Sequence, residues 1–133
     1  MGDWSSHGLE HELSALDTSI THGAGLAIIM PAWMRYVCDA DVGRFALFAH
    51  EVFGITPADE SPEAYKEAAM LGIDALQEFF ISLGMPKSLA DFGIKEEDIE
   101  KMIPTLIENK GEVFGAFRKL TADDARVIYR AAL

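Results

Sequence analysis

The sequence of 133 residues predicts an all-α protein, a single-domain bundle of about six helices over residues 1–133. Three observations support this fold class. Apolar residues recur at intervals of three and four along most of the chain, as on the buried face of an amphipathic helix. Residues that begin helices, namely Ser, Thr or Asp followed by proline or an acidic residue, precede these segments. No stretch shows the convincing polar–apolar alternation of a strand.

The first three helices are predicted from their caps and their apolar positions. A helix over residues 7–16 follows a serine pair at residues 5–6, either of which can act as its N-cap. Thr21 can cap a second helix. Asp41 begins a third helix, which Gly54 ends. The apolar positions of the second and third helices are Leu26, Ile29, Trp33 and Val37, and then Phe45, Phe48 and Val52.

The second half of the chain contains three further helix signals. Residues 61–63, SPE, supply a cap, a proline in the first turn and an acid near the positive end of the helix dipole. Residues 96–109 follow a helix pattern although Pro104 falls in the middle, and residues 121–124, TADD, begin the last helix. The positions expected to face the core are Ala68, Gly72, Ala75, Leu76, Phe79 and Leu83; Ile99, Met102, Ile103 and Leu106; and Val127, Ile128 and Leu133.

Composition argues against several classes of function. The formal net charge of −11 disfavours nucleic acid and anionic membrane surfaces, since both attract Lys and Arg. The longest uncharged run, residues 18–34, is too short and too mixed for a transmembrane span. The single cysteine, Cys38, excludes an internal disulfide framework and is compatible with a reducing cytosol. We therefore expect a soluble, cytoplasmic protein with neither a nucleic-acid nor a membrane partner.

The most informative feature is a group of histidines near the start of the chain. Three of the four histidines, His7, His11 and His22, lie within the first 22 residues. On a helix, His7 and His11 are about one turn apart and project from the same face. A short polar loop before His22 can bring it back beside them. Three imidazoles near one point indicate a transition-metal site or a proton relay.

Each histidine is expected to take a distinct role. A lone histidine on a helix is usually an ordinary surface or core residue, but three so close together favour a site. His7 and His22 are candidates for direct ligands of zinc or iron(II) through a neutral imidazole nitrogen. His11 is either a third ligand or a proton donor beside the metal. His50 stands alone on its helix and is interpreted as a structural or surface residue.

The residues around the histidines bear on this interpretation. Glu10 and Glu12 point away from the helix face that carries His11, so we interpret them as solvated or as residues that support a ligand. Gly23 and Gly25 permit close approach of the second helix to another body, such as a cofactor or a neighbouring helix.

Residues 7–11, HGLEH, also match the inverted zinc-protease pattern H-x-x-E-H. In that pattern two histidines hold zinc and the glutamate activates water. Only three residues of the pattern are fixed, so chance matches are frequent. Such an enzyme also needs a downstream acidic ligand and a strand that binds substrate, and no strand is evident. A zinc hydrolase that uses His7, Glu10 and His11 is therefore a distant alternative.

Several segments of the chain resemble a known enzyme family. They are DWSSHGLEHELSA at residues 3–15, THGAGLAI at 21–28, PAWM at 31–34, ALQEFF at 75–80, LGMP at 83–86, and the stretch from LTADD at 120–124 to the C-terminus. Together they closely resemble the iron-containing (group III) alcohol dehydrogenases, in particular the butanol dehydrogenase branch. The likeness covers essentially the whole chain. His7 and His22 are one residue further apart than in the commoner family arrangement, and the extra residue falls in the loop within residues 16–20.

This resemblance implies the C-terminal, all-helical domain of a two-domain enzyme. In the family a preceding Rossmann-like domain binds NAD(P), and a helix before the point where this chain starts supplies an aspartate and a histidine as metal ligands; neither is present in this sequence. His7 and His22 match the other two metal ligands. His11 matches the histidine near the nicotinamide that assists proton transfer. The implied cofactors are a divalent metal, iron or zinc, with an incomplete ligand set here, and NAD(P).

The implied reaction interconverts alcohols and aldehydes by hydride exchange with the nicotinamide, with the metal as Lewis acid. With only part of the ligand set, we expect this chain alone to bind metal weakly and to show no activity. A stand-alone helical module that oligomerises without catalysis is the alternative. In both cases the surface that another domain would cover is exposed, so we expect an oligomer, most simply a dimer.

Overall fold

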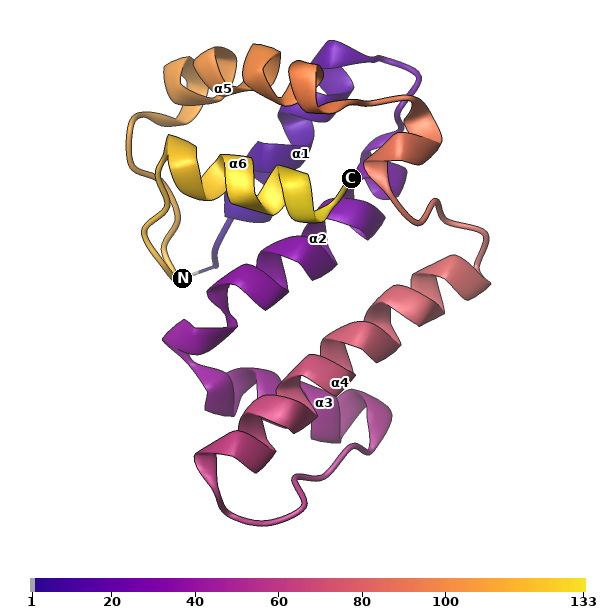
Figure 1. Cartoon of the computed structure of the whole chain (residues 1–133), viewed down its shortest axis with the longest axis vertical. Helices are drawn as coiled ribbons and strands as arrows, with labels where there is room; N and C mark the ends of the chain where they lie inside the picture. The colour runs from indigo at the N-terminus through magenta and orange to yellow at the C-terminus, as the bar shows by residue number, and fades with distance from the viewer. Residues whose placement is uncertain (1) are drawn as a thin grey trace.

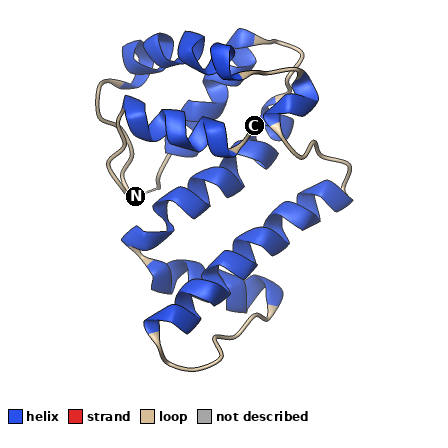
Figure 2. Cartoon of the chain, viewed as in Figure 1, coloured by secondary structure: helices blue, strands red, loops and turns tan. Residues whose placement is uncertain are grey.

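The computed structural model describes residues 2–133 and consists of helices joined by loops (Figure 1). Figure 2 shows no strand in this part of the chain, although an isolated bridge pairs Phe114 with Leu120. The predicted all-α class is confirmed. The elements are α1 (Ser5–Leu16), α2 (His22–Val37), α3 (Val42–Phe53), α4 (Pro62–Ser82), α5 (Glu96–Lys110) and α6 (Ala122–Ala131), with 3₁₀ turns at Cys38–Ala40 and Leu89–Phe92.

Helix α2 is the centre of the bundle. It contacts α1, α4 and α6, while α5 packs on α1 and α6, and α3 packs on α4. Figure 1 shows α1, α5 and α6 at one end of the molecule and the α3–α4 pair at the other, with α2 running obliquely between them. The contact between α1 and α2 therefore brings together two helices that follow each other in sequence. None of the described helices combines the length and apolarity needed to cross a bilayer.

Most helices begin and end where their caps predict. The predicted caps Thr21, Asp41 and Ser61 each accept a hydrogen bond from a backbone N–H in the first turn. Gly54 ends α3 with a φ of 68°, in the left-handed region that glycine adopts easily. Pro104 does not interrupt α5, which is continuous over Glu96–Lys110.

The start of α1 differs from the prediction. The helix begins at Ser5, and both Ser5 and Ser6 are buried in its first turn instead of capping it. The N-cap position is Trp4, whose side chain makes no capping bond. One residue earlier, Asp3 supplies an acceptor: its Oδ1 accepts a bond from the Ser5 backbone N–H at 2.7 Å. Its Oδ2 accepts bonds from the N–H groups of Ala116 and Phe117 at 2.7 and 2.6 Å. A carboxylate can satisfy several donors at once, so this residue ties the first helix to a distant loop.

Most of the predicted apolar positions are buried, but a few face solvent. Val52 is 58% exposed and Val127 is 47% exposed, because α3 and α6 turn other residues toward their neighbours. On α6 those residues are Ile128 and Tyr129, both fully buried. Helix α4 lies at the edge of the bundle (Figure 1), so one side of its C-terminal half stays uncovered. Phe79 and Leu83, at 49% and 60% exposed, lie there.

Candidate metal centre

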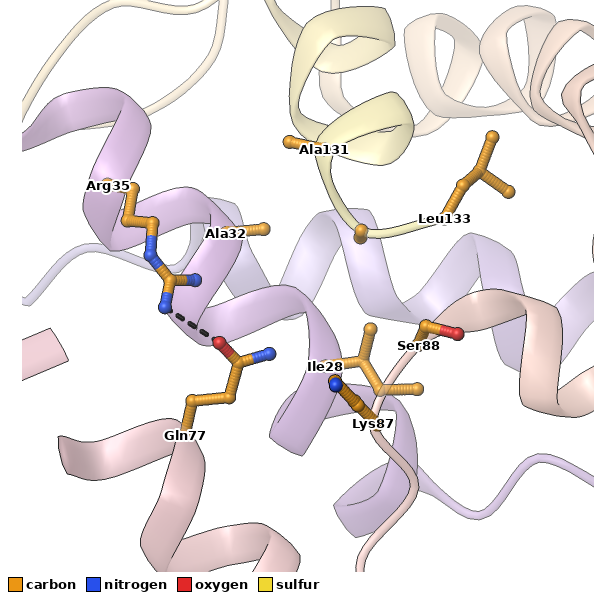
Figure 3. A pocket seen from close by; sticks show the side chains of 9 residues that line it. Ile28, Ala32, Arg35, Gln77, Lys87, Ser88, Ala131 and Leu133 are labelled. Atoms are coloured by element: carbon orange, nitrogen blue, oxygen red, sulfur yellow. Dashed lines mark hydrogen bonds between the residues drawn. The ribbon is translucent and has the colours of Figure 1, made fainter. Parts of the chain in front are cut away.

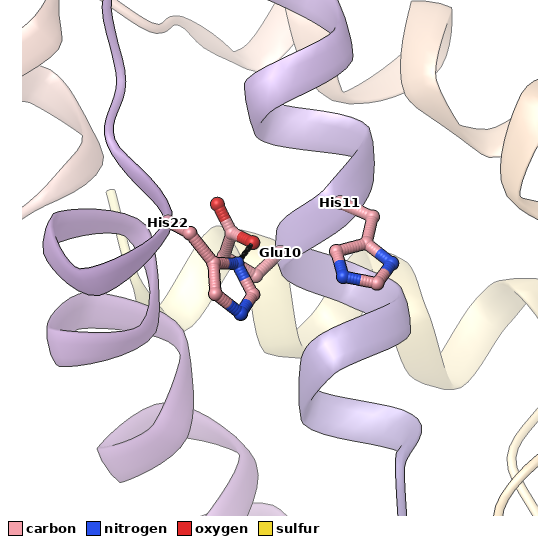
Figure 4. Close-up of side chains that lie close together, drawn as sticks. All are labelled: Glu10, His11 and His22. Carbon is pink, nitrogen blue, oxygen red and sulfur yellow. Dashed lines mark hydrogen bonds and ion pairs between the residues drawn. The ribbon is translucent and has the colours of Figure 1, made fainter.

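The three N-terminal histidines meet where α1 and α2 lie side by side. The His22 ring centroid is 5.3 Å from that of His7 and 5.2 Å from that of His11, and the His7 and His11 centroids are 6.5 Å apart. His22 is the first residue of α2, while the other two histidines come from successive turns of α1. Figure 4 shows His11 and His22 extending from their two helices into the same space. The loop between the two helices, with its extra residue, therefore allows the three histidines to converge as the sequence predicts.

The cluster lies at the molecular surface. The His22 side chain is 47% exposed, and His11 is also exposed. His7 is half-buried, and its Nδ1 is buried without a hydrogen-bond partner. The Trp4 ring, 70% exposed, lies edge-on to the His7 ring with the centroids 5.0 Å apart. The solvent-exposed side of the histidine cluster is therefore accessible to further ligands.

A buried carboxylate supports the cluster from inside the protein. Glu10 is completely buried, and its Oε2 contacts His22 Nδ1 (Figure 4). Its Oε1 lies 2.6 Å from the Ser14 hydroxyl, one helical turn further along α1. The same hydroxyl lies 3.1 Å from the carbonyl oxygen of Ile20, at the end of the loop before α2. Glu10 therefore connects the two helices at the point where the histidines meet.

The suggestion that Glu10 and Glu12 are solvated is wrong. Glu12 is only 3% exposed and accepts a hydrogen bond from the Asn109 side chain of α5 at 2.9 Å. Both glutamates are buried because α1 packs against α2 on one side and against α5 on another. The second interpretation, that a glutamate supports a histidine, agrees with the contact between Glu10 and His22.

Tyr129 of α6 is hydrogen-bonded to the backbone of α1. It is fully buried, and its hydroxyl donates a hydrogen bond of 2.6 Å to the carbonyl of Leu9. Burial raises the pKa of Tyr129, and the nearby charges of Glu12 and Glu10 raise it further. The hydroxyl therefore stays protonated and remains a donor. This bond fixes the position of the turn of α1 that carries Glu10, the residue after Leu9.

Gly25 provides the space for Glu10. A Cβ added at residue 25 would lie 2.5 Å from Glu10 Oε1 and 2.7 Å from Glu10 Cγ, closer than such atoms can approach. The close approach expected at this glycine is therefore to a side chain of the neighbouring helix. Gly23 differs, because a Cβ there would meet no atom within 4 Å.

The residues present fit a divalent metal. One potential ligand atom from each of Glu10, His11 and His22 lies within 4.8 Å of the others. His7 adds its buried Nδ1, and an unpaired buried polar atom is uncommon in a folded protein. Imidazoles with a carboxylate suit zinc or iron(II). The donors come from two helices, α1 and α2, and two of them, His11 and His22, are exposed at the surface.

Two pockets were not anticipated from the sequence. One, of about 370 Å³, lies between α2, α4 and the C-terminal residues, and in it Arg35 donates a 2.7 Å bond to Gln77 (Figure 3). None of its lining residues belongs to the histidine cluster. The other, of about 340 Å³, is almost entirely apolar, begins at Gly23 and lies between α2 and the end of α4. His50 belongs neither to the histidine cluster nor to the lining of these two pockets. It is exposed, and its Nδ1 lies 3.3 Å from the Thr56 hydroxyl, as expected of a surface residue.

The match to known proteins extends over the whole chain. Residues 1–133 match the family described as the Fe-containing alcohol dehydrogenase family, C-terminal. The chain belongs to this family. It is 44% identical over 135 aligned residues to a probable NADH-dependent butanol dehydrogenase of Bacillus subtilis, covering 99% of this chain and 33% of that protein. It is 38% identical to NADH-dependent butanol dehydrogenase A of Clostridium acetobutylicum, covering 96% of this chain and 32% of that protein.

Solved structures of the family share this fold. The crystal structure of NADH-dependent butanol dehydrogenase A from Thermotoga maritima matches with a TM-score of 0.85 and 38% identity, over 98% of this chain and 33% of that one. The substrate- and cofactor-free aldehyde reductase of Escherichia coli matches with a TM-score of 0.88 and 31% identity, over the same shares. The chain therefore spans about a third of the length of these relatives. This membership, together with the burial of Glu10, argues against the zinc-hydrolase alternative.

The sequence suggests only part of the support of the site, namely a glutamate beside a ligand and a glycine that permits close approach. Nothing in the sequence singles out Ser14, although it lies four residues after Glu10 and therefore one turn away on the same face of a helix. The link between Glu10 and Gly25 has no local signal, because it depends on how two helices pack. The only hint was a glycine three residues after a candidate ligand.

Proposed function

We propose that this chain is the C-terminal, metal-binding part of an NAD(P)-dependent alcohol dehydrogenase that interconverts alcohols and aldehydes. The observation that carries the proposal is the convergence of His7, His11 and His22 at one surface of a chain of this family. The names of the relatives, which are NADH-dependent butanol dehydrogenases, support the substrate class and the cofactor.

The three histidines take different roles in this proposal. His7 and His22 bind the metal, iron or zinc, from α1 and α2. When bound, the metal supplies a Lewis acid that stabilises the negative charge of an alcohol oxygen. His11, exposed beside His22, holds or passes a proton at an imidazole nitrogen. Its pairing with His22 also keeps open the alternative of a third ligand.

The site also needs residues from outside this chain. Two imidazoles leave a divalent metal with open positions, since structural and catalytic zinc sites use at least three protein ligands. We propose that a dinucleotide-binding part of the enzyme supplies the remaining ligands and the NAD(P) site. The length of the relatives, about three times that of this chain, supports this arrangement. We also propose a cytoplasmic location and a dimer.

Metal binding tests the proposal most directly. Zn²⁺ binding is measured by calorimetry for the 133-residue chain and for His7→Ala, His22→Ala and His50→Ala. We expect weak binding by the parent chain, at least about tenfold weaker binding by the first two variants, and no change in His50→Ala, which lies outside the cluster. Equal affinity in all four proteins would contradict the ligand assignment. His11→Ala decides its role, because a third ligand reduces affinity whereas a proton carrier does not.

Activity tests the dependence on another domain. We expect the chain alone to show no NAD(P)-dependent oxidation of butanol, and activity to appear when a dinucleotide-binding part is supplied. Oxidation of butanol by the chain alone that is lost in His22→Ala would overturn the proposal that the site is incomplete.

A stand-alone oligomerising module is the second candidate function. The observation in its favour is exposed apolar surface at the end of α4, where Leu83 is 60% exposed and Met85 is 37% exposed. The genetic context separates the two candidates. A glycine-rich dinucleotide-binding domain encoded directly upstream favours the enzyme, and its absence there favours the module.

A further inference from the structure

Glu10 is an unusual residue to find completely buried. Carboxylates are seldom fully buried unless they are paired, because the loss of hydration destabilises the charge. Among the described residues, the nitrogen-bearing side chain that contacts Glu10 is His22 and not a lysine or an arginine. Ser14 supplies one further hydrogen bond, at 2.6 Å. The position of this carboxylate is therefore determined mainly by one imidazole.

The contact uses one defined nitrogen of His22. Nδ1 faces the Glu10 carboxylate, so Nε2 is the nitrogen left for other partners. In Figure 4 the Glu10 carboxylate lies against the His22 ring, and the His11 ring stands to the right of both. A neutral imidazole carries its proton on only one nitrogen, and an acceptor-only carboxylate requires that proton to be on the nitrogen facing it. The pairing thus selects one of the two tautomers of His22.

The packing of α2 against α1 leaves a space beside His22 that the Glu10 carboxylate fills. Gly25 lies one turn after His22 on α2, and any larger residue there would place its Cβ 2.5 Å from Glu10 Oε1. Glycine is an unfavourable helix residue, by about 1 kcal/mol relative to alanine. Its presence at a buried helix position is explained by the need to admit the Glu10 side chain beneath His22.

We propose that Glu10 is a positioning residue that holds His22 as the Nδ1–H tautomer and so presents Nε2 as its metal-binding atom. Gly25 contributes because the absence of a side chain there leaves the space that the Glu10 side chain occupies. The statement about the tautomer concerns this chain alone, whereas the statement about the metal rests on the proposed function. Glu10 acts through His22 in this proposal and binds no metal itself.

Long-range ¹H–¹⁵N NMR of the 133-residue chain tests the tautomer without any metal. The spectra are recorded about two pH units above the ordinary histidine pKa of about 6.5. We expect the parent chain to show His22 as Nδ1–H. Glu10→Met keeps the length of the side chain but removes the acceptor, so it should shift His22 toward Nε2–H, whereas Glu10→Gln, which retains an acceptor oxygen, should largely preserve the parent spectrum. Glu12→Met is the matched control, because it removes a buried carboxylate of the same helix that does not touch His22.

Gly25→Ala provides an independent variant that keeps Glu10. The added methyl group displaces the carboxylate, so His22 should lose its Nδ1–H preference as it does in Glu10→Met. Parent-like His22 signals in both variants would overturn the proposal. Should either variant fail to fold, as judged by circular dichroism, the other decides, together with Glu10→Gln.

Zn²⁺ affinity separates this inference from the proposed function. Residues that hydrogen-bond to the free nitrogen of a ligating histidine typically contribute about 10–100-fold in metal affinity. We expect a loss of that size in Glu10→Met, a smaller loss in Glu10→Gln and no loss in Glu12→Met. A loss in Glu10→Gln as large as in His22→Ala would overturn the inference, since it would make Glu10 a direct ligand. An Nδ1–H tautomer that depends on Glu10 in a chain that binds no Zn²⁺ would support the positioning of His22 and contradict only the metal site.

Discussion

Gly25 of α2 faces the carboxylate of Glu10 of α1 so closely that a methyl group at residue 25 would lie 2.5 Å from Glu10 Oε1. The two residues are complementary in size across a helix–helix contact. Glu10 supplies a buried carboxyl side chain, and Gly25, which has no side chain, leaves the space for it. This close packing of α2 against α1 places His22, the first residue of α2, against Glu10 and beside the other histidines. The geometry of the candidate centre therefore depends on packing between the helices as well as on its ligands.

We predict that Gly25→Ala destabilises the protein by about 1–3 kcal/mol, the range expected for an extra methyl group in a packed interior. Glycine-to-alanine changes in a helix ordinarily stabilise it by up to about 1 kcal/mol, so the sign of the effect is diagnostic. Gly23→Ala is the control in the same helix, since its methyl group meets no atom within 4 Å and should be neutral or stabilising. Urea unfolding followed by circular dichroism measures both. Equal effects of the two substitutions would contradict the contact.

A second close contact joins α3 and α4. A Cβ at Gly72 would lie 2.4 Å from the Cβ of Ala49 and 2.8 Å from its Cα. We predict that Gly72→Ala costs about 1–3 kcal/mol in the free energy of unfolding, because backbone atoms cannot move aside as a flexible side chain can. Gly43→Ala, at an exposed helical position with only an ordinary contact at 3.7 Å, should be neutral or stabilising. Thermal unfolding of the two variants compares them, and a stable Gly72→Ala protein would show that the helices can separate without cost.

The elements of the fold are largely predictable because their signals are local. Thr21, Asp41 and Ser61 begin helices through bonds to N–H groups a few residues away, so sequence spacing is sufficient to find them. The start of α1 is not predictable from the local sequence, because Asp3 is fixed by bonds to residues more than 100 positions later. Distant partners leave no trace in the local pattern.

The candidate site divides in the same way. The three histidines are predictable because they are close in sequence and of a residue type that binds metals. The burial of Glu10 is not predictable, since a glutamate on a helix is normally exposed and only the packing of α1 between its neighbours reveals otherwise. Phe79 shows the reverse error: its spacing fits an apolar stripe, but no helix covers that side of α4.

Asp3 is predicted to make stability depend on pH. Burial alone would raise the pKa of Asp3, but the hydrogen bonds from Ser5, Phe117 and Ala116 outweigh it and hold the pKa below its ordinary value. The carboxylate therefore stabilises the fold fully above the unfolded pKa of about 3.9, and this contribution is lost as the pH falls through the lower pKa of the folded state. Asp3→Asn should be less stable than the parent at neutral pH, with a difference that shrinks below about pH 4. Urea unfolding at several pH values measures it.

The control for this pH dependence is Glu112→Gln, which removes an exposed carboxylate from a loop. It should change stability little at any pH, because exposed charges are well hydrated in both states. A difference between parent and Asp3→Asn that is constant from neutral to acid pH would mean that the charge of Asp3 is not what binds the loop.

Self-association is predicted through the apolar surface between α2 and the end of α4. That surface is formed by Leu26, Met30, Phe80, Leu83 and Met85, and contiguous exposed apolar patches favour protein contacts. The net charge of −11 opposes association, but its repulsion is screened beyond about 8 Å at physiological salt. A twofold dimer lets each copy of the surface cover the other. Burial contributes about 25 cal/mol per Å² before the entropy of association is subtracted, so several hundred Å² favour a dimer of modest affinity.

Sedimentation velocity tests this prediction with one disruptive variant and one matched control. Leu83→Asp places a charge on the apolar surface and should yield a monomer, because burial of an unpaired charge is strongly unfavourable. Val113→Asp adds the same charge at an equally exposed residue elsewhere, 56% against 60%, and should associate like the parent. Leu83→Asp and Val113→Asp share one net charge, so a difference between them cannot come from general repulsion. A parent chain that is monomeric at high micromolar concentration would contradict the dimer, and equal association of all three proteins would place the interface on another face.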